Sequence, residues 1–545
     1  MLQMLAQYYC WLARFIIPVA AVAVIVLCAR ILFGTKRDKP LLAQFTDRKG
    51  NVFPITSYEN AIGRARLCDV CVPAKRASLR AAALVLKDDG WHIYPTGSGC
   101  AVLVNGERIS GDTAITGGDV VNIAGAELEL DDDFDTGLPR EYGAELNKTR
   151  AKCAALTLTV MQLMMGLTLV IHYSHDGYIP VQIYACFGAL IAVEWIYFAL
   201  RRFDRVGVEL CAFFLATVGL CVAASAVPSS LYKQFIAMLL GLAIFFVLEL
   251  VLGNLALTMK LRYAVGMCAV GLLLFNIIFG TEMNGAKNWI NLGFVTVQPS
   301  EFVKIAYVFA GCAALERLVT TRNLLLFTAF SGCCMVPLFI MRDFGTASIF
   351  FVGMLIIAYM RSGDLKAIIL FVTAAVAGMA AIIALKPYVA GRFATYRHAW
   401  EFANEGGYQQ TRTMIAIGSG GIFGVGGGKG NLDLVPAADT DLVFGFVVEE
   451  WGMIVGLCCV SVLVLFALYA FRNVRLATSS YYAIAGCAAA GMLIFQAALN
   501  IFGSTDLLPL TGVTLPLISN GGSSMMASFG ILAFIKASGA GGDSR

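Results

Sequence analysis

One carboxylate, that of Asp441, stands where a long polar and glycine-rich interval gives way to an apolar helix. It belongs to the segment 434–450, which reads LVPAADTDLVFGFVVEE, and it precedes a predicted helix over 442–471. A carboxylate in such a place can remove a proton from a hydroxyl group as a general base. It can also cap the helix, as Thr440 can, because these side chains accept hydrogen bonds from the first backbone N–H groups. The residues alone leave both roles open.

Two further polar segments carry charges next to apolar helices. In the first, Glu301 and Lys304 lie one helical turn apart and can form an ion pair. Ions inside a membrane are costly and mark a working site by default, although a pair that only pins two helices would have the same sequence. In the second, Asp343 can pair with Lys304 or with a cation of a substrate, or it can cap the helix that follows.

The polar interval 387–441 is long for a plain connection, which indicates a functional loop. Its glycine-rich stretch 418–430 is similar to a phosphate-binding loop, but Lys429 is followed by Gly430 instead of Ser or Thr. We therefore expect no nucleotide cofactor. A third polar segment, 519–524, interrupts an apolar run, and its serines either line a path for a lipid or cap a helix.

The elements that position these residues are membrane helices. Of the 545 residues, 59% are hydrophobic and only 14% are charged, which excludes a water-soluble globule of this length. A run of about 20 apolar residues crosses a bilayer. The sequence therefore predicts a polytopic all-α membrane protein with about thirteen transmembrane helices. They are an N-terminal anchor within 1–40 and spans near 153–173, 180–200, 209–228, 234–253, 263–280, 300–316, 323–341, 344–360, 366–386, 442–471, 479–503 and 517–536.

Basic residues cluster at alternate ends of these spans, and such clusters favour the cytoplasmic side of a membrane. On this rule, the segments 281–298, 387–441 and 504–516 lie outside the cell. The C-terminus and the polar region after the first span lie inside. The charged segments near Asp441 are thus predicted to share the outer face of the cytoplasmic (plasma) membrane.

The polar region 44–131 alternates short strands with turns, which predicts a cytoplasmic β-sandwich inserted after the first helix. Residues 132–152 read as a linker to the membrane domain, 153–537. The region resembles a forkhead-associated (FHA) domain through Ile62-Gly63-Arg64, Ser78 with Ala82, Asn105-Gly106 and Gly118-Asp119.

The FHA resemblance implies that Arg64, Ser78 and Asn105 hold a phosphothreonine peptide of a partner protein. An arginine fork and a hydroxyl group suit a phosphate dianion. Leu79 and Ala81 stand where this family usually has Arg and His. The domain therefore either binds phosphothreonine or only docks a partner.

Five motifs in the second half of the chain resemble the SEDS family, whose members include FtsW and RodA. They are GAKNWINLG with QPSEFVK (285–304), DFGTA (343–347), GYQQ with AIGSGGIFGVG (407–426), TDLVFGFVVEEWG (440–452) and LPLTGVTLPLISNGGSS (508–524). They occur in the order of the family, within a motif-bearing core over 265–537. Asn288, Arg342 and Asn520 depart from the usual Arg, Pro and Tyr.

The SEDS resemblance implies a peptidoglycan glycosyltransferase that polymerises lipid II in cell division, elongation or sporulation. It implies a class B penicillin-binding protein, a transpeptidase, as partner, and no nucleic acid is expected. The essential Asp of the family falls on Asp441, which would act as general base while a sugar hydroxyl attacks an anomeric carbon. A single displacement inverts that carbon and needs no second catalytic carboxylate.

The diphosphate leaving group needs cations. Lys386, Arg392, Arg397 and Lys429 can supply them, as can a divalent metal (Mg or Mn) bound by Asp441. We also expect Glu301, Lys304, Asp343 and Ser523 to contact the substrate. Two other functions stay open at this point. A lipid II flippase would not need Asp441, and a non-enzymatic scaffold for the transpeptidase would not need the charges of the loop.

Overall fold

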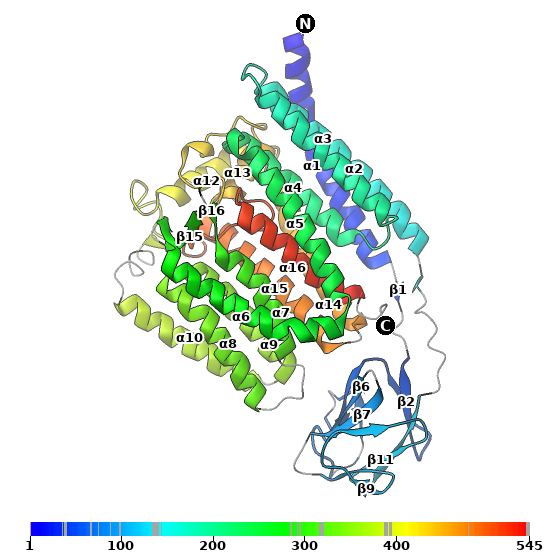
Figure 1. Cartoon of the computed structure of the whole chain (residues 1–545). Helices are drawn as coiled ribbons and strands as arrows, with labels where there is room; N and C mark the ends of the chain where they lie inside the picture. Colours follow the sequence, from blue (N-terminus) through cyan, green and yellow to red (C-terminus); the bar gives the residue numbers. More distant parts are fainter. Residues whose placement is uncertain are drawn as a thin grey trace.

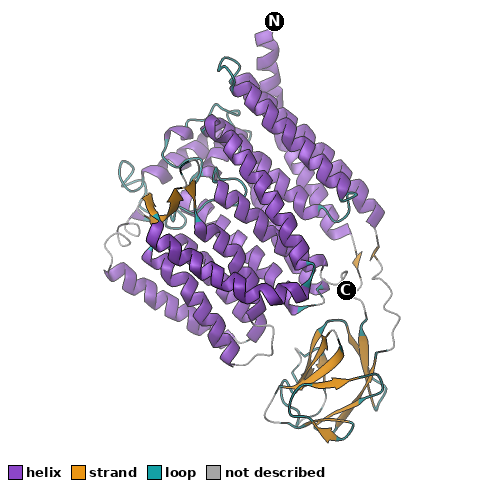
Figure 2. Ribbon diagram, viewed as in Figure 1, coloured by secondary structure: helices purple, strands orange, loops and turns teal. Residues whose placement is uncertain are grey.

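The computed structural model divides the chain into a large helical domain and a small β-domain, shown in Figures 1 and 2. In Figure 1, the β-domain lies beside one end of the helical domain, here called the near end, and α12, α13 and β15 lie at the opposite, far end. The structure describes residues 2–540 except 35, 38–40, 66–67, 73, 75, 88, 97–99, 133–140, 143, 284–285, 292, 294–295, 315–320, 364, 386–390, 392–394 and 478.

The β-domain is a sandwich of two sheets. One has the strand order β10-β7-β6-β4-β5 and the other β3-β2-β12-β11-β8-β9. Alternate side chains such as Phe45, Ile62 and Val121 are buried between them. The strands are β2 (Ala43–Asp47), β3 (Val52–Ile55), β4 (Glu59–Gly63), β5 (Val70–Cys71), β6 (Ala82–Lys87), β7 (Gly90–Pro95), β8 (Val102–Val104), β9 (Glu107–Arg108), β10 (Thr113–Ile115), β11 (Val120–Ile123) and β12 (Ala126–Asp131).

The predicted β-sandwich over 44–131 is thus present, and it follows the first helix as expected. All but one of the described strand pairs in its two sheets are antiparallel; β4 and β5 pair in parallel. A separate short pair, β1 (Lys36–Arg37) with β13 (Glu141–Tyr142), joins the two chain segments that connect the β-domain to the helices.

Apolar runs of the predicted lengths form the helices of the large domain. They are α1 (Leu2–Gly34), α2 (Ala144–His172), α3 (Ile179–Leu200), α4 (Gly207–Ala226), α5 (Leu231–Leu252), α6 (Leu255–Phe279), α7 (Pro299–Ala314), α8 (Thr321–Ile340), α9 (Phe344–Ser362), α10 (Leu365–Leu385), α12 (Tyr408–Gly420), α13 (Val443–Trp451), α14 (Met453–Leu476), α15 (Ser480–Ser504) and α16 (Gly522–Ala540). The chain is a multi-pass membrane protein.

The predicted count of thirteen spans is not confirmed. Within the described residues, nine helices are long and apolar enough to cross a membrane, namely α1 to α6, α9, α14 and α15. The spans predicted at 300–316, 323–341, 366–386 and 517–536 are also helical, as α7, α8, α10 and α16, but are not among these nine.

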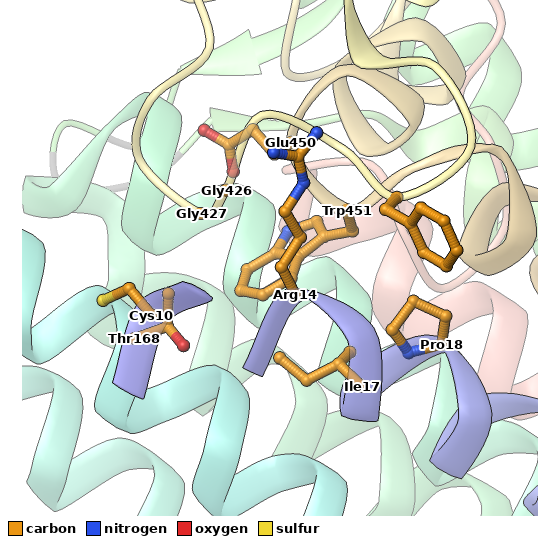
Figure 3. Close-up of a pocket in the computed structure, with 10 residues that line it drawn as sticks. Cys10, Arg14, Ile17, Pro18, Thr168, Gly426, Gly427, Glu450 and Trp451 are labelled. Carbon is orange, nitrogen blue, oxygen red and sulfur yellow. The ribbon is translucent and has the colours of Figure 1, made fainter. Parts of the chain in front are cut away.

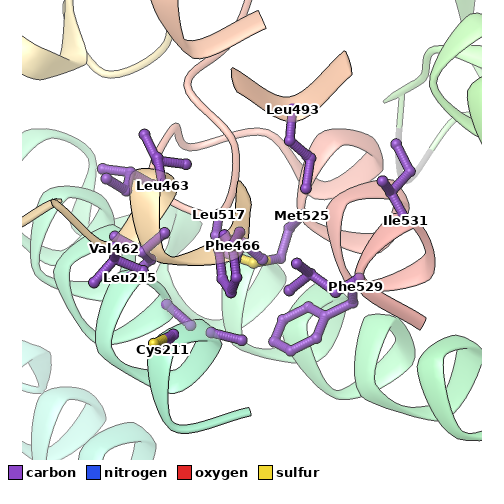
Figure 4. Packing of buried hydrophobic residues seen from close by; sticks show 14 of the residues in the cluster. Cys211, Leu215, Val462, Leu463, Phe466, Leu493, Leu517, Met525, Phe529 and Ile531 are labelled. Carbon is purple, nitrogen blue, oxygen red and sulfur yellow. The ribbon is translucent and has the colours of Figure 1, made fainter. Parts of the chain in front are cut away.

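Helix α4 is packed on all sides, since every residue from Gly207 to Ser225 is buried. Leu215 on α4, Phe466 on α14 and Phe529 on α16 belong to one continuous apolar core, part of which is shown in Figure 4. Helix α1 packs along α2 and α14, so the anchor is an integral part of the bundle. Tight packing of this kind gives the far end a rigid support.

The prediction of a single helix over 442–471 is wrong, because the chain breaks between α13 and α14. At the break, Gly452 has φ 89° and ψ 164°, a region that only glycine adopts readily. A Cβ atom at this position would lie 2.4 Å from the carbonyl oxygen of Ile422. A glycine inside an apolar run thus ends the short helix α13 and changes the direction of the chain before α14.

The interval 387–441 is also more ordered than a plain loop. It contains α12 and a 3₁₀ turn, Leu432–Leu434, and α12 packs against α13. Thr413 on α12 faces Gly445 on α13, where a Cβ atom would lie 2.4 Å from the threonine methyl group. The segment 281–297 likewise forms three short strands, β14 (Thr281–Met283), β15 (Ala286–Asn291) and β16 (Thr296–Val297), at the far end.

Candidate active site

Asp441 ends a tight turn that leads into α13. Its N–H donates to the carbonyl oxygen of Ala437 at 2.9 Å, and Ala437 has a φ of 61°. The N-cap position of α13 falls on Leu442, one residue after Asp441, and Leu442 makes no side-chain cap hydrogen bond. The Asp441 side chain is half-buried, and the helix that follows it, α13, lies at the far end of the domain.

The Asp441 carboxylate faces the backbone of a second far-end segment. A Cβ atom built on Gly512 would lie 3.3 Å from Oδ2 of Asp441. Gly512 has a φ of 69°, which L side chains rarely adopt. The glycine of the motif LPLTGVT therefore leaves room for the carboxylate of the motif TDL.

Side chains from α15 and from the turn before α16 hold the Asp441 turn from behind. Asn500 on α15 donates its Nδ2 to the carbonyl oxygens of Val513 at 2.7 Å and of Asp441 at 3.0 Å. Ser519 donates its hydroxyl to the carbonyl oxygen of Thr440 at 2.6 Å. The backbone on both sides of Asp441 is thus fixed by buried groups, which preorganises the carboxylate.

Asn520, one of the departures from the usual motif, also supports this turn. Its N–H donates to the carbonyl oxygen of Asp439 at 2.9 Å, and its Nδ2 donates to Oδ2 of Asp439 at 2.8 Å. The same amide donates to the hydroxyl oxygen of Ser230 at 2.8 Å. Asp439 therefore helps to hold this turn in place.

The predicted ion pair of Glu301 and Lys304 is confirmed, with 2.7 Å between Oε2 and Nζ. Lys304 also donates to Oε1 of Gln496 on α15 at 2.7 Å. Gln496 in turn donates to the carbonyl oxygen of Thr514 at 3.0 Å. Gln496 and Asn500 lie one turn apart on α15. The ion pair of Glu301 and Lys304 is therefore connected, through Gln496, to the segment that contains Gly512.

Lys304 and Glu301 expose 1% and 4% of their side chains. They therefore lie behind the surface that Asp441 faces, and their observed contacts pin α7 to α15. Of the two roles that the sequence allowed for this pair, these contacts match the structural one, in which the pair holds two helices together.

Asp343 takes the structural role that its position allowed. It caps α9, with Oδ1 accepting from the N–H of Thr346 at 3.1 Å. Its Oδ2 accepts from Nδ2 of Asn288 at 2.8 Å and from Nε2 of Gln298 at 3.2 Å. Lys304 is bound by Glu301 and Gln496 instead.

The remaining predicted residues are spread over the far end. Ser523 is buried and accepts a hydrogen bond from the N–H of Gln298 at 3.1 Å. Arg397 is exposed, and its N–H donates to Asp506 at 3.1 Å, which docks its segment on the loop that continues to Gly512. Lys386 and Arg392 lie outside the described residues.

Lys429 is not brought to Asp441. Its loop wraps the opposite end of α13, where the N–H groups of Val425 and Gly426 donate to the carbonyl oxygens of Glu449 and Glu450 at 2.8 and 2.9 Å. Nine residues of helix, about 13 Å, separate the two ends of α13. The glycine-rich stretch is therefore a packing loop.

Two carboxylates at the end of α13, those of Glu449 and Glu450, hold this loop. Glu449 accepts from the N–H groups of Asn431 and Leu432 at 3.1 and 3.0 Å. Glu450 accepts from the N–H of Gly428 at 3.0 Å. Glu450 also lines a pocket between α1 and this loop, together with Arg14 and Trp451 (Figure 3).

In the β-domain, the structure brings Arg64 and Ser78 together. The N–H of Arg64 donates to the carbonyl oxygen of Ser78 at 3.0 Å, the Arg64 side chain is exposed and the Ser78 side chain is half-buried. Asn105 forms the tip of the β8–β9 hairpin. Its Nδ2 donates to Asp119 at 2.7 Å and its Oδ1 accepts from the N–H of Val120 at 2.9 Å, so both amide atoms already brace the hairpin.

The hydrogen bonds that brace this hairpin also shift the pKa of Asp119. Although burial opposes the shift, the hydrogen bonds donated by Thr116 and Asn105 hold the pKa of Asp119 below its ordinary value. The contribution of Asp119 to stability is therefore present above its unfolded-state pKa, about 3.9, and is lost as the pH falls through the lower folded-state pKa.

Comparison with known proteins decides the family. The family model of FtsW, RodA and SpoVE, described as "Cell cycle protein", matches residues 210–540. The chain belongs to this family. The FHA domain model matches residues 60–124, within the β-domain. Both resemblances inferred from the motifs are thereby confirmed.

Two relatives carry the name "Probable peptidoglycan glycosyltransferase FtsW". The protein from Tolumonas auensis is 31% identical over 62% of this chain and 93% of its own length. The protein from Dichelobacter nodosus is 28% identical over 61% of this chain and 89% of its own length. A solved structure described as a peptidoglycan synthase complex that coordinates polymerization and crosslinking matches with a TM-score of 0.52 and 25% identity, over 60% of this chain and 95% of that chain.

Proposed function

We propose that this protein is a peptidoglycan glycosyltransferase that lengthens glycan strands from lipid II, with Asp441 as the general base. The proposal rests on the way in which the structure fixes Asp441. Its carboxylate faces Gly512, and its backbone is fixed by Asn500 and Ser519. A preorganised carboxylate in the TDL motif, in a chain of this family, fits this role better than a role in lipid passage.

In this reaction, the 4-hydroxyl of an acceptor sugar attacks the anomeric carbon of the donor, and the bond from that carbon to the diphosphate-lipid breaks. Asp441 accepts the hydroxyl proton as the new bond forms. The diphosphate leaves with its negative charge, so no general acid is required. The anomeric carbon inverts because a single displacement occurs.

Cations near the diphosphate stabilise the charge that develops on it. Arg397 is anchored to the loop that continues to Gly512 and is the described arginine that we assign to this task. Among the described residues, no group of three or more His, Cys, Asp and Glu side chains could hold a metal ion. A divalent metal such as Mg²⁺ is the alternative source of positive charge: Asp441 together with the substrate phosphates would hold it, and it would stabilise the charge on the diphosphate.

The far end, which carries Asp441, is proposed to face the outside of the cytoplasmic membrane, and the β-domain is proposed to lie in the cytoplasm. The clusters of basic residues support this orientation. A class B penicillin-binding protein is the proposed partner for crosslinking. The solved synthase complex, which couples polymerization to crosslinking, supports this choice.

The experiment that tests the function is polymerisation of labelled lipid II by the purified protein in detergent or nanodiscs, with and without a candidate transpeptidase. We expect glycan polymer from the wild type. Movement of lipid II across proteoliposomes without any polymer would instead support a flippase. Buried charges that a flippase could use have structural partners; Glu194 on α3, for example, accepts from Gln162 at 2.7 Å.

Replacing Asn500 by Asp should slow polymerisation about tenfold or more. The substitution keeps the shape of the side chain but removes the amide donor that faces the carbonyl oxygens of Val513 and Asp441. Leaving buried acceptors unpaired costs about 1–3 kcal/mol. Asn291→Asp, at the exposed end of β15, is the matched control. Equal rates for both variants would contradict the role of Asn500 in positioning Asp441.

For the β-domain, we propose that Arg64 and Ser78 bind phosphothreonine. The full-length protein should bind a phosphothreonine peptide more tightly than its unphosphorylated form in fluorescence anisotropy. Arg64→Ala should weaken binding at least tenfold, because a charge-assisted contact to phosphate is lost. Binding should strengthen as the pH rises through about 6, where the phosphate becomes a dianion.

Arg108→Ala, on exposed β9, is the control for this measurement and should leave the affinity unchanged. Equal binding of the two peptides by the wild type would favour the alternative in which the domain only docks a partner.

A further inference from the structure

Among the described residues, side chains of the β-domain and of the helical domain meet in a polar cluster at the near end. Glu59, the first residue of β4, accepts a hydrogen bond from the hydroxyl of Ser480, the first residue of α15. Arg361, in the last turn of α9, lies with Nη1 3.7 Å from Oε2 of Glu59 and 3.0 Å from the Ser480 hydroxyl oxygen, to which it donates. Three elements from two domains thus share one set of hydrogen bonds.

This cluster is shielded from water, unlike an ordinary surface ion pair. The side chains of Arg361 and Glu59 expose 13% and 21% of their surface. Screening by solvent and salt is weaker for such a pair than for exposed charges. Next to the cluster, Ser479 caps α15 by accepting from the N–H of Tyr481 at 3.3 Å.

Two of the three elements that meet at the cluster, β4 and α15, each lead to a proposed site. Strand β4 runs from Glu59 to Gly63, about 17 Å, and Arg64 of the proposed phosphothreonine site follows it. Helix α15 runs from Ser480 to the far end, where it carries Asn500 about 30 Å away. Asn500 holds the Asp441 turn.

We propose that Glu59, Arg361 and Ser480 form a docking contact that fixes the β-domain on the near ends of α9 and α15, and that this contact keeps α15 in the position in which Asn500 supports Asp441. The docked β-domain carries its exposed Arg64 at the other end of β4, so a phosphorylated partner can bind there while the contact is closed. The effect on activity rests on the function proposed above, whereas the contact itself does not.

Hydrogen–deuterium exchange of the full-length protein in nanodiscs tests the contact. Glu59→Gln should raise the exchange rate of the amides in the second and third turns of α15 about tenfold. Glu107→Gln, on exposed β9 of the same domain, is the matched control and should leave α15 unchanged. Unchanged exchange in α15 of the Glu59→Gln variant would overturn the proposal.

A charge exchange tests the consequence for activity. Glu59→Arg and Arg361→Glu should each slow lipid II polymerisation several-fold. The double variant should restore the rate, because the two exchanged charges can again pair with each other and with the hydroxyl of Ser480 between them. Single variants as fast as the wild type, or faster, would overturn the link to α15. If the wild type makes no polymer at all, the proposed function fails, while the exchange measurement still decides the contact.

Discussion

Asp441→Asn should reduce polymerisation of lipid II by about 10²–10⁴-fold, the usual contribution of a general base. The amide has nearly the shape of the carboxylate but cannot accept the proton of the attacking hydroxyl. The variant should fold, because Asn500 and Ser519 still fix this turn through the carbonyl oxygens of Asp441 and Thr440. The loss should therefore fall on the rate and leave stability intact.

Asp433→Asn is the matched control for this experiment. Asp433 lies in the same interval, within the 3₁₀ turn, and its side chain is exposed. The control should polymerise at the wild-type rate, and both variants should show the wild-type melting temperature. Polymer formed at a normal rate by well-folded Asp441→Asn protein would contradict the assignment of the general base and favour the scaffold or flippase functions.

The long motifs gave the family and the identity of the central carboxylate, because their residues are contiguous in sequence. Their arrangement in space came only from the structure. Nothing in the sequence pairs Gly512 with Asp441, or places Asn500, 59 residues away, on the carbonyl of Asp441. Such contacts depend on how α15 packs, which local pattern does not encode.

The predictions of a single helix over 442–471 and of Lys429 as a cation beside Asp441 fail for the same physical reason. Hydrophobicity predicted one long helix, but Gly452 adopts a backbone conformation that only glycine favours and turns the chain. This break leaves α13 as a short helix with Asp441 at one end and the Lys429 loop at the other. A cation that is near Asp441 in sequence is thereby kept from it in space.

The β-domain was predicted more fully, because strand alternation and turn residues are local signals. Asn105-Gly106, a pair typical of tight turns, lies at one, with φ values of 49° and 88°. Its contact with phosphopeptide could not be judged from sequence, since the amide atoms bond to Asp119 and Val120 across the sheet.

Lys304→Met should destabilise the protein by about 3–5 kcal/mol, because removing one partner of a buried ion pair leaves the other charge uncompensated. Glu301 would keep its carboxylate in a site that exposes only 4% of its side chain. The measurement is the free energy of unfolding in detergent. The exposed pair of Glu145 and Lys148 on α2 has the same spacing and a 2.8 Å contact. Lys148→Met should therefore cost less than about 1 kcal/mol.

The double variant Glu301→Gln with Lys304→Met separates folding from positioning. Most of the stability should return, because no unpaired charge remains. Polymerisation should stay slow, because the hydrogen bond from Lys304 to Gln496 is still missing and Gln496 holds the carbonyl of Thr514, next to the Gly512 turn. Recovery of both stability and rate would mean that the pair only pins α7 to α15. Recovery of stability alone would mean that the pair also orients the segment that Asp441 faces.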